Sequence, residues 1–432
     1  MSVRMRSPSP LTALVVLAAA LVLGAAAAPH ATAATGVEYG LTDDAWLKDG
    51  PGTLDDRLAT LDRLGVRVVR YSIRWNVVAT TRPAVGSDPT DAAYDWSGDD
   101  DVLDGLHEHG IDVLVQLVGT PRWANGGKPP NWAPLSASTF RSFATAAATR
   151  YPWVLRWLIW NEPNQARWLR PTTAAVYTSR LLNPAYAAIH KEIPGAQVAG
   201  GGTAPRAGAG GVSPVTWLTA MRRAHARLDA YAHNPYPLDP KRESPISGGC
   251  TRCATITMAT ISKLVVLVAR NFPRARIWLT EYGYQTNPPD RLLGVSPALQ
   301  ATYASEGAYT AYRTARVDLL IHFLYRDEPN LQRFQSGLVT LGEKVKPSFA
   351  AFELPLAQTA RQGPRVSLWG EFRAPDTGST ATIERRVGRT WRLVATVARG
   401  SGGYFRWTGS LPPRTVVRLH AGATVGAPLT LR

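Results

Sequence analysis

The sequence predicts a parallel (β/α)8 barrel followed by a small all-β sandwich. Eight short, apolar, β-branched segments alternate with longer segments of helical periodicity between residues 37 and 357, which is typical of a parallel sheet covered by helices. From residue 361 the chain has only short alternating strands joined by Gly, Pro and Ser turns, which favours a sandwich. A doubly wound open sheet also alternates, but the first strand is followed by YGLTDDAW, which contains no glycine-rich phosphate turn.

Residues 1–34 are predicted to be a secretory signal peptide. MSVRMR carries two arginines, an apolar stretch follows, and ATA at 31–33 supplies small residues for cleavage near Ala33 or Ala34. We therefore expect a secreted protein, extracellular or associated with the cell envelope. The alternative is a single membrane anchor. No later segment approaches the roughly 20 uninterrupted apolar residues of a spanning helix, so we expect no stable membrane insertion.

The (β/α)8 barrel domain, which is expected to carry the catalytic site, is predicted at residues 35–357. The segment 53–65 illustrates its helices, because leucines recur there at three- and four-residue spacing and Gly65 follows as a cap. The last barrel helix is expected in KPSFAAFELPLA. The eight predicted strands are 37–42, 66–75, 111–119, 154–160, 196–202, 229–236, 275–283 and 317–325.

The accessory domain is expected at residues 361–432. It contains no paired carboxylates or histidine cluster that would indicate chemistry of its own. Its aromatic residues suit either a sugar-binding face or a core, and the core is favoured because so small a domain needs its large apolar side chains. The arginine-rich stretch ERRVGRTWR at 384–392 suits an anionic polymer or envelope surface.

The formal net charge of +16 becomes +14 when Arg4 and Arg6 leave with the signal peptide. Only seven of the 48 basic residues are lysine, and the arginines are scattered along the chain. A nucleic-acid-binding patch usually forms a cluster of basic residues, so we expect a basic surface and no nucleic acid partner. We also expect the protein to be a monomer.

Cys250 and Cys253 lie in GGCTRC. Such a pair suits redox chemistry or half of a zinc site, but a second pair of ligands is absent. Behind a signal peptide, a local disulfide in this glycine-rich loop is the better interpretation. We expect no metal and no cofactor.

Two glutamates end predicted barrel strands. Glu162 follows the fourth strand in WLIWNEPN, and Glu281 ends the seventh in IWLTEYGY, so both are expected at the carboxyl-end mouth, where barrel active sites lie. Two facing carboxylates suit glycosidic bond cleavage, because one protonates the leaving oxygen while the other attacks the anomeric carbon. The alternative is that each caps a helix or pairs with an arginine. Glu328, in the echo DEPN after strand eight, is expected in a loop turn.

WNEPN followed by LTEYGY resembles the clan A retaining glycoside hydrolases, and the resemblance covers the whole barrel. TPRWA after strand three and HNPYP after strand six are similar to family 39, including its bacterial exopolysaccharide hydrolases. VRYSIRW on strand two resembles the R-x-x-x-x-W pattern of family 5. The resemblance implies a hydrolase that acts with retention of anomeric configuration.

The resemblance also implies site roles. Glu162 is the general acid/base, and Asn161 binds the sugar's 2-hydroxyl. Glu281 is the nucleophile, and Tyr236 contacts it. Arg70 holds the nucleophile ionised, as a nearby cation does, and Arg74, which has the same strand parity, is the alternative.

Further substrate-binding candidates surround these residues. His233 lies near the clan's histidine, although HNPY has one residue more than the usual H-x-Y spacing. In HFLYRDEPN, Tyr325 takes the place of the strand-eight tryptophan as a sugar platform, and Arg326 and Asp327 suit hydroxyls or an acidic sugar. Trp123 is the best placed of three tryptophans expected at the mouth, the others being Trp75 and Trp132.

The leading hypothesis is a secreted retaining glycosidase acting on a polysaccharide or oligosaccharide. The alternatives are an inactive carbohydrate-binding or scaffolding barrel, which needs neither glutamate, and a metal-dependent hydrolase, which needs His and Asp at several strand ends. The eight histidines are scattered, and HEH at 107–109 falls on a helix.

Overall fold

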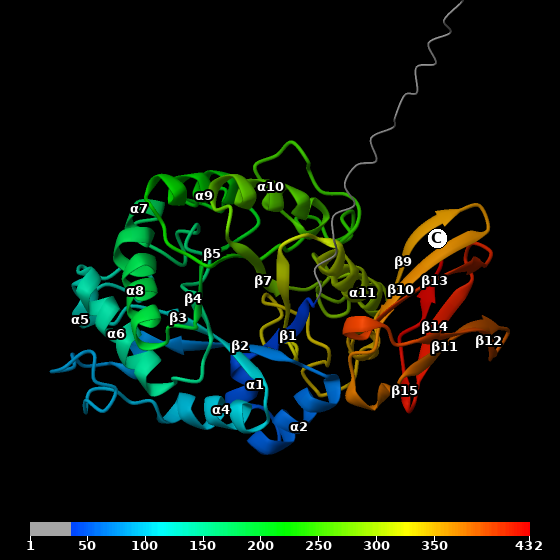
Figure 1. The fold of residues 1–432 in the computed structure, drawn as a ribbon, viewed down its shortest axis with the longest axis horizontal. Coiled ribbons are helices and arrows are strands. Elements are labelled where there is room, and N and C mark those ends of the chain that lie inside the picture. Colours follow the sequence, from blue (N-terminus) through cyan, green and yellow to red (C-terminus); the bar gives the residue numbers. More distant parts are fainter. Residues whose placement is uncertain (1–35) are drawn as a thin grey trace, which may run out of the picture.

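A computed structural model describes residues 36–432, so the predicted signal peptide lies outside the described residues. Eight parallel strands close into a barrel in chain order, with the last pairing to the first, and the predicted (β/α)8 architecture is confirmed (Figure 1). The barrel strands are β1 (Glu38–Thr42), β2 (Val68–Arg74), β3 (Asp112–Val118), β4 (Arg156–Ile159), β5 (Gln197–Thr203), β6 (Ala230–His233), β7 (Arg276–Tyr282) and β8 (Val317–Phe323).

Helices surround the barrel as an outer layer (Figure 1). The helix predicted at 53–65 is confirmed: Thr53 and Asp56 form a reciprocal capping box at its start, and Gly65 ends it in the left-handed conformation with φ 69°. In chain order the helices are α1 (Asp44–Asp49), α2 (Leu54–Leu64), α3 (Trp75–Val78), α4 (Ser97–Glu108), α5 (Arg122–Asn125), α6 (Ala137–Arg150), α7 (Ala174–Tyr177), α8 (Asn183–Glu192), α9 (Pro214–Arg223), α10 (Ile261–Asn271), α11 (Pro297–Arg313) and α12 (Pro347–Glu353).

Side chains alternate between the barrel interior and the helical layer. The interior cluster includes Val68 on β2, Ala230 and Ala232 on β6, and Trp278 on β7. Intervening residues such as Tyr231 pack outward into the main core. Because the period of a strand is two, this alternation decides which polar residues at the strand ends reach the mouth.

The C-terminal residues form two antiparallel sheets packed on a shared apolar core, which confirms the predicted all-β domain. The first sheet begins at Leu356, before residue 361 where the sequence placed the domain, because residues 356–362 pair with the following strand. The strands are β9 (Leu356–Gln362), β10 (Arg365–Glu371), β11 (Thr380–Val387), β12 (Thr390–Ala398), β13 (Tyr404–Ser410), β14 (Val416–Ala421), β15 (Thr424–Val425) and β16 (Leu429–Thr430).

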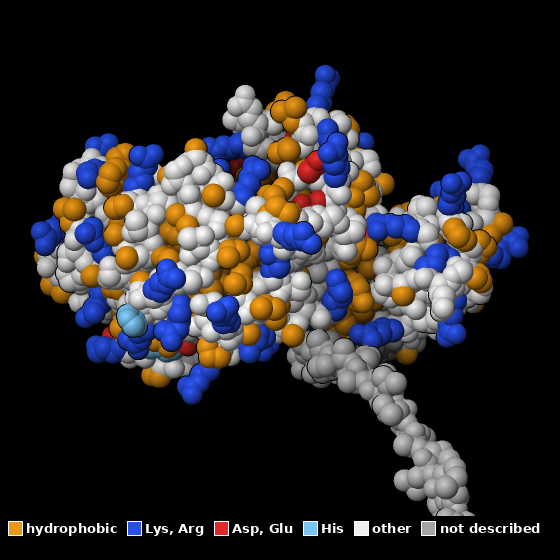
Figure 2. Space-filling view, turned by 90° about the horizontal axis from the view of Figure 1, so that it is seen from above, with side chains coloured by type: hydrophobic (Ala, Val, Ile, Leu, Met, Phe, Trp, Pro, Cys, Tyr) orange, Lys and Arg blue, Asp and Glu red, His pale blue; other side chains and the backbone are white. Residues whose placement is uncertain are grey.

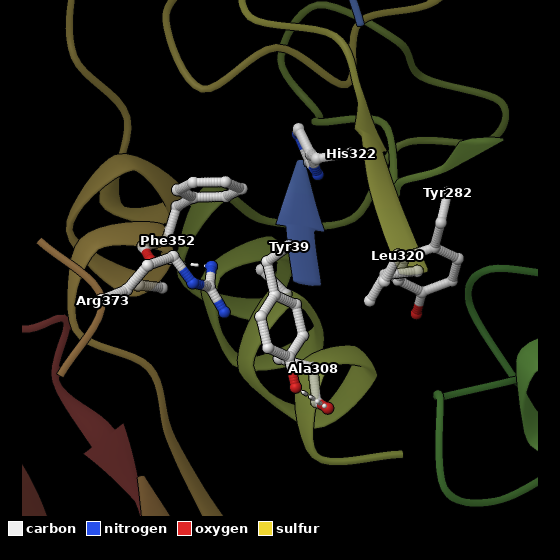
Figure 3. Close-up of a pocket in the computed structure, with 9 residues that line it drawn as sticks. Tyr39, Tyr282, Ala308, Leu320, His322, Phe352 and Arg373 are labelled. Atoms are coloured by element: carbon white, nitrogen blue, oxygen red, sulfur yellow. Dashed lines mark hydrogen bonds between the residues drawn. The ribbon is translucent and has the colours of Figure 1, made fainter. Parts of the chain in front are cut away.

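The C-terminal sheets are joined to the barrel by buried aromatic and charged residues. Trp369 on β10 is fully buried and belongs to the core of the barrel. Arg373 lies 4.1 Å from the ring of Tyr39 on β1 and 4.5 Å from that of Phe352 on α12, and it pairs with Glu371 at 2.7 Å (Figure 3). The cavity beside these residues has a volume of about 20 Å³, room for about one water molecule, so it is a packing gap of the joint.

Cys250 and Cys253 form a disulfide, with Cα atoms 5.4 Å apart, in the loop after β6. The ammonium of Lys263 donates hydrogen bonds to the carbonyls of Cys250, Cys253 and Thr255, which fastens the loop to α10. Across residues 36–432, none of the helices combines the length and the apolar character needed to span a bilayer.

Candidate active site

Glu281 reaches the mouth through an irregularity in β7. Trp278 points into the barrel and Leu279 packs outward, as regular alternation requires. The register with β8 then shifts between Leu279 and Tyr282, and both Thr280 and Glu281 make contacts inside the mouth. A β-bulge re-aims side chains in this way, and here it places a carboxylate where regular geometry would not.

The Glu281 carboxylate has two buried partners. Arg70 on β2 donates a hydrogen bond from Nη1 to Oε1 at 2.6 Å, and Tyr236 donates from its hydroxyl to Oε2 at 3.0 Å. Glu281 is 6% exposed and Arg70 is 5% exposed, so the pair is little screened by water. Burial and the nearby carboxylates raise the pKa of Tyr236, which keeps its hydroxyl protonated as a donor.

Glu162 is positioned by a sharp turn at the end of β4. Trp160 and Glu162 both have positive φ, 71° and 37°. The turn is fixed from both sides, because Gln116 on β3 donates to the carbonyl of Trp160 at 3.1 Å and the Glu162 amide donates to the carbonyl of Gly202 on β5 at 3.0 Å. A strained backbone conformation of this kind persists only where the surrounding structure fixes it, as these hydrogen bonds do here. The turn directs the Glu162 side chain into the mouth.

The Glu162 carboxyl is buried in a different environment from that of Glu281. It is 4% exposed, and it accepts hydrogen bonds from Asn234 at 3.3 Å and from the largely exposed Arg167 at 3.1 Å. Burial, and then the charge of Glu281, raise the pKa of Glu162, while Arg167 opposes that rise. A carboxyl with a raised pKa is suited to donate a proton near neutral pH.

Asn234 links the two carboxylates. Its amide nitrogen donates to Glu162, and its oxygen accepts a hydrogen bond from the Thr280 hydroxyl at 2.8 Å, beside Glu281. Tyr236, two residues along the same loop, contacts Glu281 directly. Asn234 lies within the motif HNPY but was not among the site residues predicted from the sequence. The alternation Ala230, Ala232, Asn234 was the signal that pointed to it.

His233, expected near the substrate, faces away from the mouth and is fully buried. Its Nδ1 lies 2.8 Å from the Thr203 hydroxyl and its Nε2 lies 3.0 Å from the carbonyl of Ile256, so both ring nitrogens are occupied. Burial lowers the pKa of His233 to about 4, and the ring is neutral. It supports the β5–β6 region and makes no contact with either glutamate.

Asn161 lies next to Glu162, and its side-chain oxygen is 3.5 Å from the Nε2 of Gln116. It is buried at the end of β4 together with Glu162. The structure thus brings five predicted site residues together at the mouth of the barrel, as expected from the strand assignments. They are Arg70 on β2, Asn161 and Glu162 after β4, Tyr236 after β6 and Glu281 on β7.

Tyr325 is not an open platform after β8. It is 6% exposed and packs on Trp46, with the ring centroids 3.9 Å apart. Phe323, the last residue of β8, was not predicted from the sequence and lies beside Tyr236, the tyrosine that contacts Glu281. Phe323 is half-buried, and its ring centroid lies 6.3 Å from that of Tyr236 and 4.8 Å from that of Phe334.

Trp123 is partly buried rather than open to the mouth. Its indole N–H donates to the carbonyl of Ala79 at 2.8 Å, and its ring meets Trp75 edge-on at a centroid distance of 5.4 Å. Trp75 is fully buried, and Lys128 lies 3.9 Å above the ring of Trp132. These contacts are those of loop and core packing.

The echo motif DEPN lies in a loop. Glu328 accepts a hydrogen bond from the amide of Phe334 at 2.7 Å, as a loop turn requires. Asp327 is buried in an ion pair with Lys346 at 2.7 Å, and Arg326 pairs with Glu343 at 2.7 Å. These two charges therefore hold the loop after β8, in place of the substrate contacts expected of them.

By sequence, no protein-family model and no curated protein matches the chain. By structure, it is similar to a GH39 β-xylosidase from Caulobacter crescentus, at 17% identity and a TM-score of 0.56, covering 92% of this chain and 98% of that one. A GH39 enzyme from Xanthomonas axonopodis pv. citri matches at 14% identity and a TM-score of 0.56, covering 89% and 93% of the two chains.

CelM2, a bifunctional glucanase-xylanase from a metagenome library, matches at 12% identity and a TM-score of 0.53, covering 90% of this chain and 96% of that one. At these identities the similarity concerns the fold. The chain has a GH39-like clan A glycoside hydrolase fold, as the resemblance of its motifs implied.

Proposed function

We propose that this chain is a secreted retaining glycoside hydrolase that cleaves O-glycosidic bonds of a polysaccharide or oligosaccharide, with Glu281 as nucleophile and Glu162 as general acid/base. The observation that carries the proposal is the contrast between two neighbouring carboxyl groups. Glu281 is held by a buried guanidinium at 2.6 Å, the partner expected of a carboxylate nucleophile. Burial and the charge of Glu281 raise the pKa of Glu162, which favours a protonated acid.

In the first step, a Glu281 oxygen attacks the anomeric carbon while the bond from that carbon to the leaving oxygen breaks. Glu162 transfers its proton to the leaving oxygen, and a covalent glycosyl-enzyme results. Formation of the ester removes the negative charge of Glu281, so the charge of Glu162 is then tolerated beside it. The hydrogen bonds that Tyr236 and Arg70 donate to the Glu281 oxygens weaken as the negative charge passes from Glu281 to Glu162.

In the second step, the Glu162 carboxylate accepts a proton from water as that water attacks the anomeric carbon. The bond to Glu281 breaks, and the sugar leaves with its original anomeric configuration. Asn234, whose amide donates a hydrogen bond to Glu162 at 3.3 Å, helps to hold the acid/base in place. Asn161, next to Glu162, is the proposed contact for the sugar's 2-hydroxyl.

The substrate class and the location rest on separate support. The similar structures are named as a β-xylosidase and a glucanase-xylanase, which supports a glycan as substrate. The signal-peptide pattern of residues 1–34 and the Cys250–Cys253 disulfide support secretion, because disulfides persist in oxidising compartments.

The test is a screen of aryl glycosides and glycans with the mature protein, Glu281→Gln and Glu328→Gln. Glu328 is a matched control, because it occupies the same position in the echo DEPN but serves a loop turn. We expect Glu281→Gln to abolish turnover and Glu328→Gln to retain it. Proton NMR of the first-formed product should show retained configuration. Inverted product, or wild-type turnover by Glu281→Gln, would exclude the proposed mechanism.

A further inference from the structure

The positive charge of the chain is concentrated in its C-terminal domain. Residues 361–432 contain twelve arginines, no lysine and three acidic residues, so their net charge is 12 − 3 = +9. The whole chain carries +16, which leaves 16 − 9 = +7 for the other 360 residues. The arginines that looked scattered along the sequence are therefore unevenly distributed between the two domains.

The β11–β12 hairpin gathers four of these arginines. Arg385 and Arg386 lie on β11, Arg389 in the turn and Arg392 on β12, and all four are exposed. β12 is an edge strand, and it lies at the outer end of the domain, where Figure 2 shows blue side chains at the edge of the molecule. The hairpin thus presents its charge to solvent, away from the joint with the barrel.

The arrangement within the hairpin is unfavourable without a ligand. Arg385 and Arg392 are directly opposite in the ladder, and like charges in that position destabilise a sheet. None of the four arginines of this hairpin takes part in an ion pair within residues 36–432. The nearby acid, Glu384, is already paired with Arg418 at 2.7 Å. The positive charge is left uncompensated.

An aromatic ring lies beside the charges. Trp391 is opposite Arg386 in the ladder and is only partly buried, unlike Trp369 of the same domain. The guanidinium of Arg418 lies 4.2 Å from its ring centroid, which fixes the indole in place. Because opposed residues share a face, the partly open ring lies on the same face as Arg386 and offers an apolar surface beside one of the anion-binding groups.

We propose that the β11–β12 hairpin binds an anionic polysaccharide, through the carboxylate or phosphate groups of that polymer. Guanidinium groups bind these planar or multidentate anions through paired hydrogen bonds, which ammonium groups do not. The domain uses arginine alone. Arg385 and Arg392 project from one face of the hairpin and Arg386 from the other, with Arg389 in the turn between them, so a flexible polymer with repeated charges can reach all four around the tip.

A polysaccharide fits the hairpin better than the other polyanions. The turn residues Gly388 and Arg389 are not apolar, but Val387 and Leu393 of the same hairpin are exposed, so binding to anionic lipid is an outcome that the test must distinguish. The signal-peptide pattern places the protein outside the cytoplasm, away from nucleic acid. This binding surface is separate from the mouth, and its existence does not depend on the proposed catalysis.

The test measures binding of the full mature chain to polygalacturonate, phosphomannan and neutral mannan at low and high salt. The double variant R385Q/R392Q removes the opposed pair, and R389Q removes the turn charge while leaving the ladder intact. R222Q/R223Q is the matched control, because it removes two exposed arginines from α9 on the barrel.

We expect R385Q/R392Q to bind the anionic polymer about fivefold more weakly at low salt, R389Q to show a smaller loss, and the control to bind like wild type. The polymer that binds more tightly identifies carboxylate or phosphate as the recognised group. Melting temperatures check that the variants fold. Equal losses in the control variant, equal binding to neutral mannan, or tighter binding to an oligothymidylate or to anionic phospholipid vesicles would each overturn the proposal.

Discussion

The buried pair of Arg70 and Glu281 makes a prediction that needs no substrate. The two side chains are 2.6 Å apart, and Arg70 and Glu281 are only 5% and 6% exposed. Water therefore cannot solvate either charge if its partner is removed. Replacing Arg70 by Met leaves the Glu281 carboxylate buried without its cation. Loss of one partner of a buried pair costs about 3–5 kcal/mol of the free energy of unfolding.

The double variant Arg70→Met/Glu281→Gln should be more stable than Arg70→Met alone, because it removes the stranded charge as well. Tyr236 still has the amide oxygen of the new glutamine as an acceptor, so this substitution adds little cost of its own. We expect an interaction free energy of about 2–3 kcal/mol between the two substitutions, the upper part of the range for residues in contact.

The assay is equilibrium unfolding in urea of the wild type, both single variants and the double variant. Arg57→Met combined with Glu281→Gln is the matched control, because Arg57 is also buried but donates to the backbone carbonyls of Leu47, Lys48, Gly50 and Gly52 and to no carboxylate. That combination should be additive. Additivity within about 0.5 kcal/mol for the Arg70 cycle would refute the buried ion pair as the organiser of the site.

Three further predictions concern the acid and the disulfide. Glu162→Ala should retain activity on aryl glycosides with good leaving groups, which need no proton, and lose it on poor ones; equal loss on both would exclude the acid role. In Arg167→Gln the pKa of Glu162 should rise, because the positive charge that lowers it is lost. The basic limb of the kcat/KM profile should then move to higher pH, by about half a unit or less because Arg167 is largely exposed. A shift to lower pH would contradict this. Reduction of Cys250–Cys253 should lower the melting temperature only slightly and leave turnover unchanged, because the closed loop is short, and a large loss of activity would contradict this.

The sequence predicted the position of each site residue along its strand. Apolar runs mark where β2, β4 and β7 lie, and a polar residue at the end of such a run must face the mouth or a partner. Glu162 and Glu281 were found in this way, whereas Arg70, in the middle of β2, was predicted from the resemblance, and the contacts of all three agree with that placement. Each of these predictions depends only on local pattern, which is why it survives in the folded chain.

The direction of a side chain was harder to predict. His233 was predicted near the substrate because it lies near the clan's histidine, although its spacing to Tyr236 is one residue longer than usual. The alanines at 230 and 232 occupy the narrow interior, so the next inward position is 234. The histidine at 233 is sent outward to Thr203. The family resemblance suggested His233, whereas the two-residue period of a β-strand places Asn234 at the mouth.

Long-range packing lay beyond the local pattern. Tyr325 was predicted as a platform because it takes the place of the clan's strand-eight tryptophan, but Trp46, distant in the chain, packs on its ring at a centroid distance of 3.9 Å. Trp369 likewise leaves the core of its own domain and packs against Tyr309 and Tyr312 of α11. No periodicity within either segment indicates a partner on another element.

Both carboxylates lie where regular β geometry is interrupted. Regular alternation in β7 would place only one of Thr280 and Glu281 inside the barrel, and the bulge places both there. Thr280 then anchors Asn234, which holds Glu162, so the two glutamates share one hydrogen-bonded support. The positive φ of Glu162 costs on the order of 1–3 kcal/mol, a cost that the surrounding barrel core can offset. Because the same interruptions connect the acid to the nucleophile, a shift of either carboxylate must disturb the position of the other.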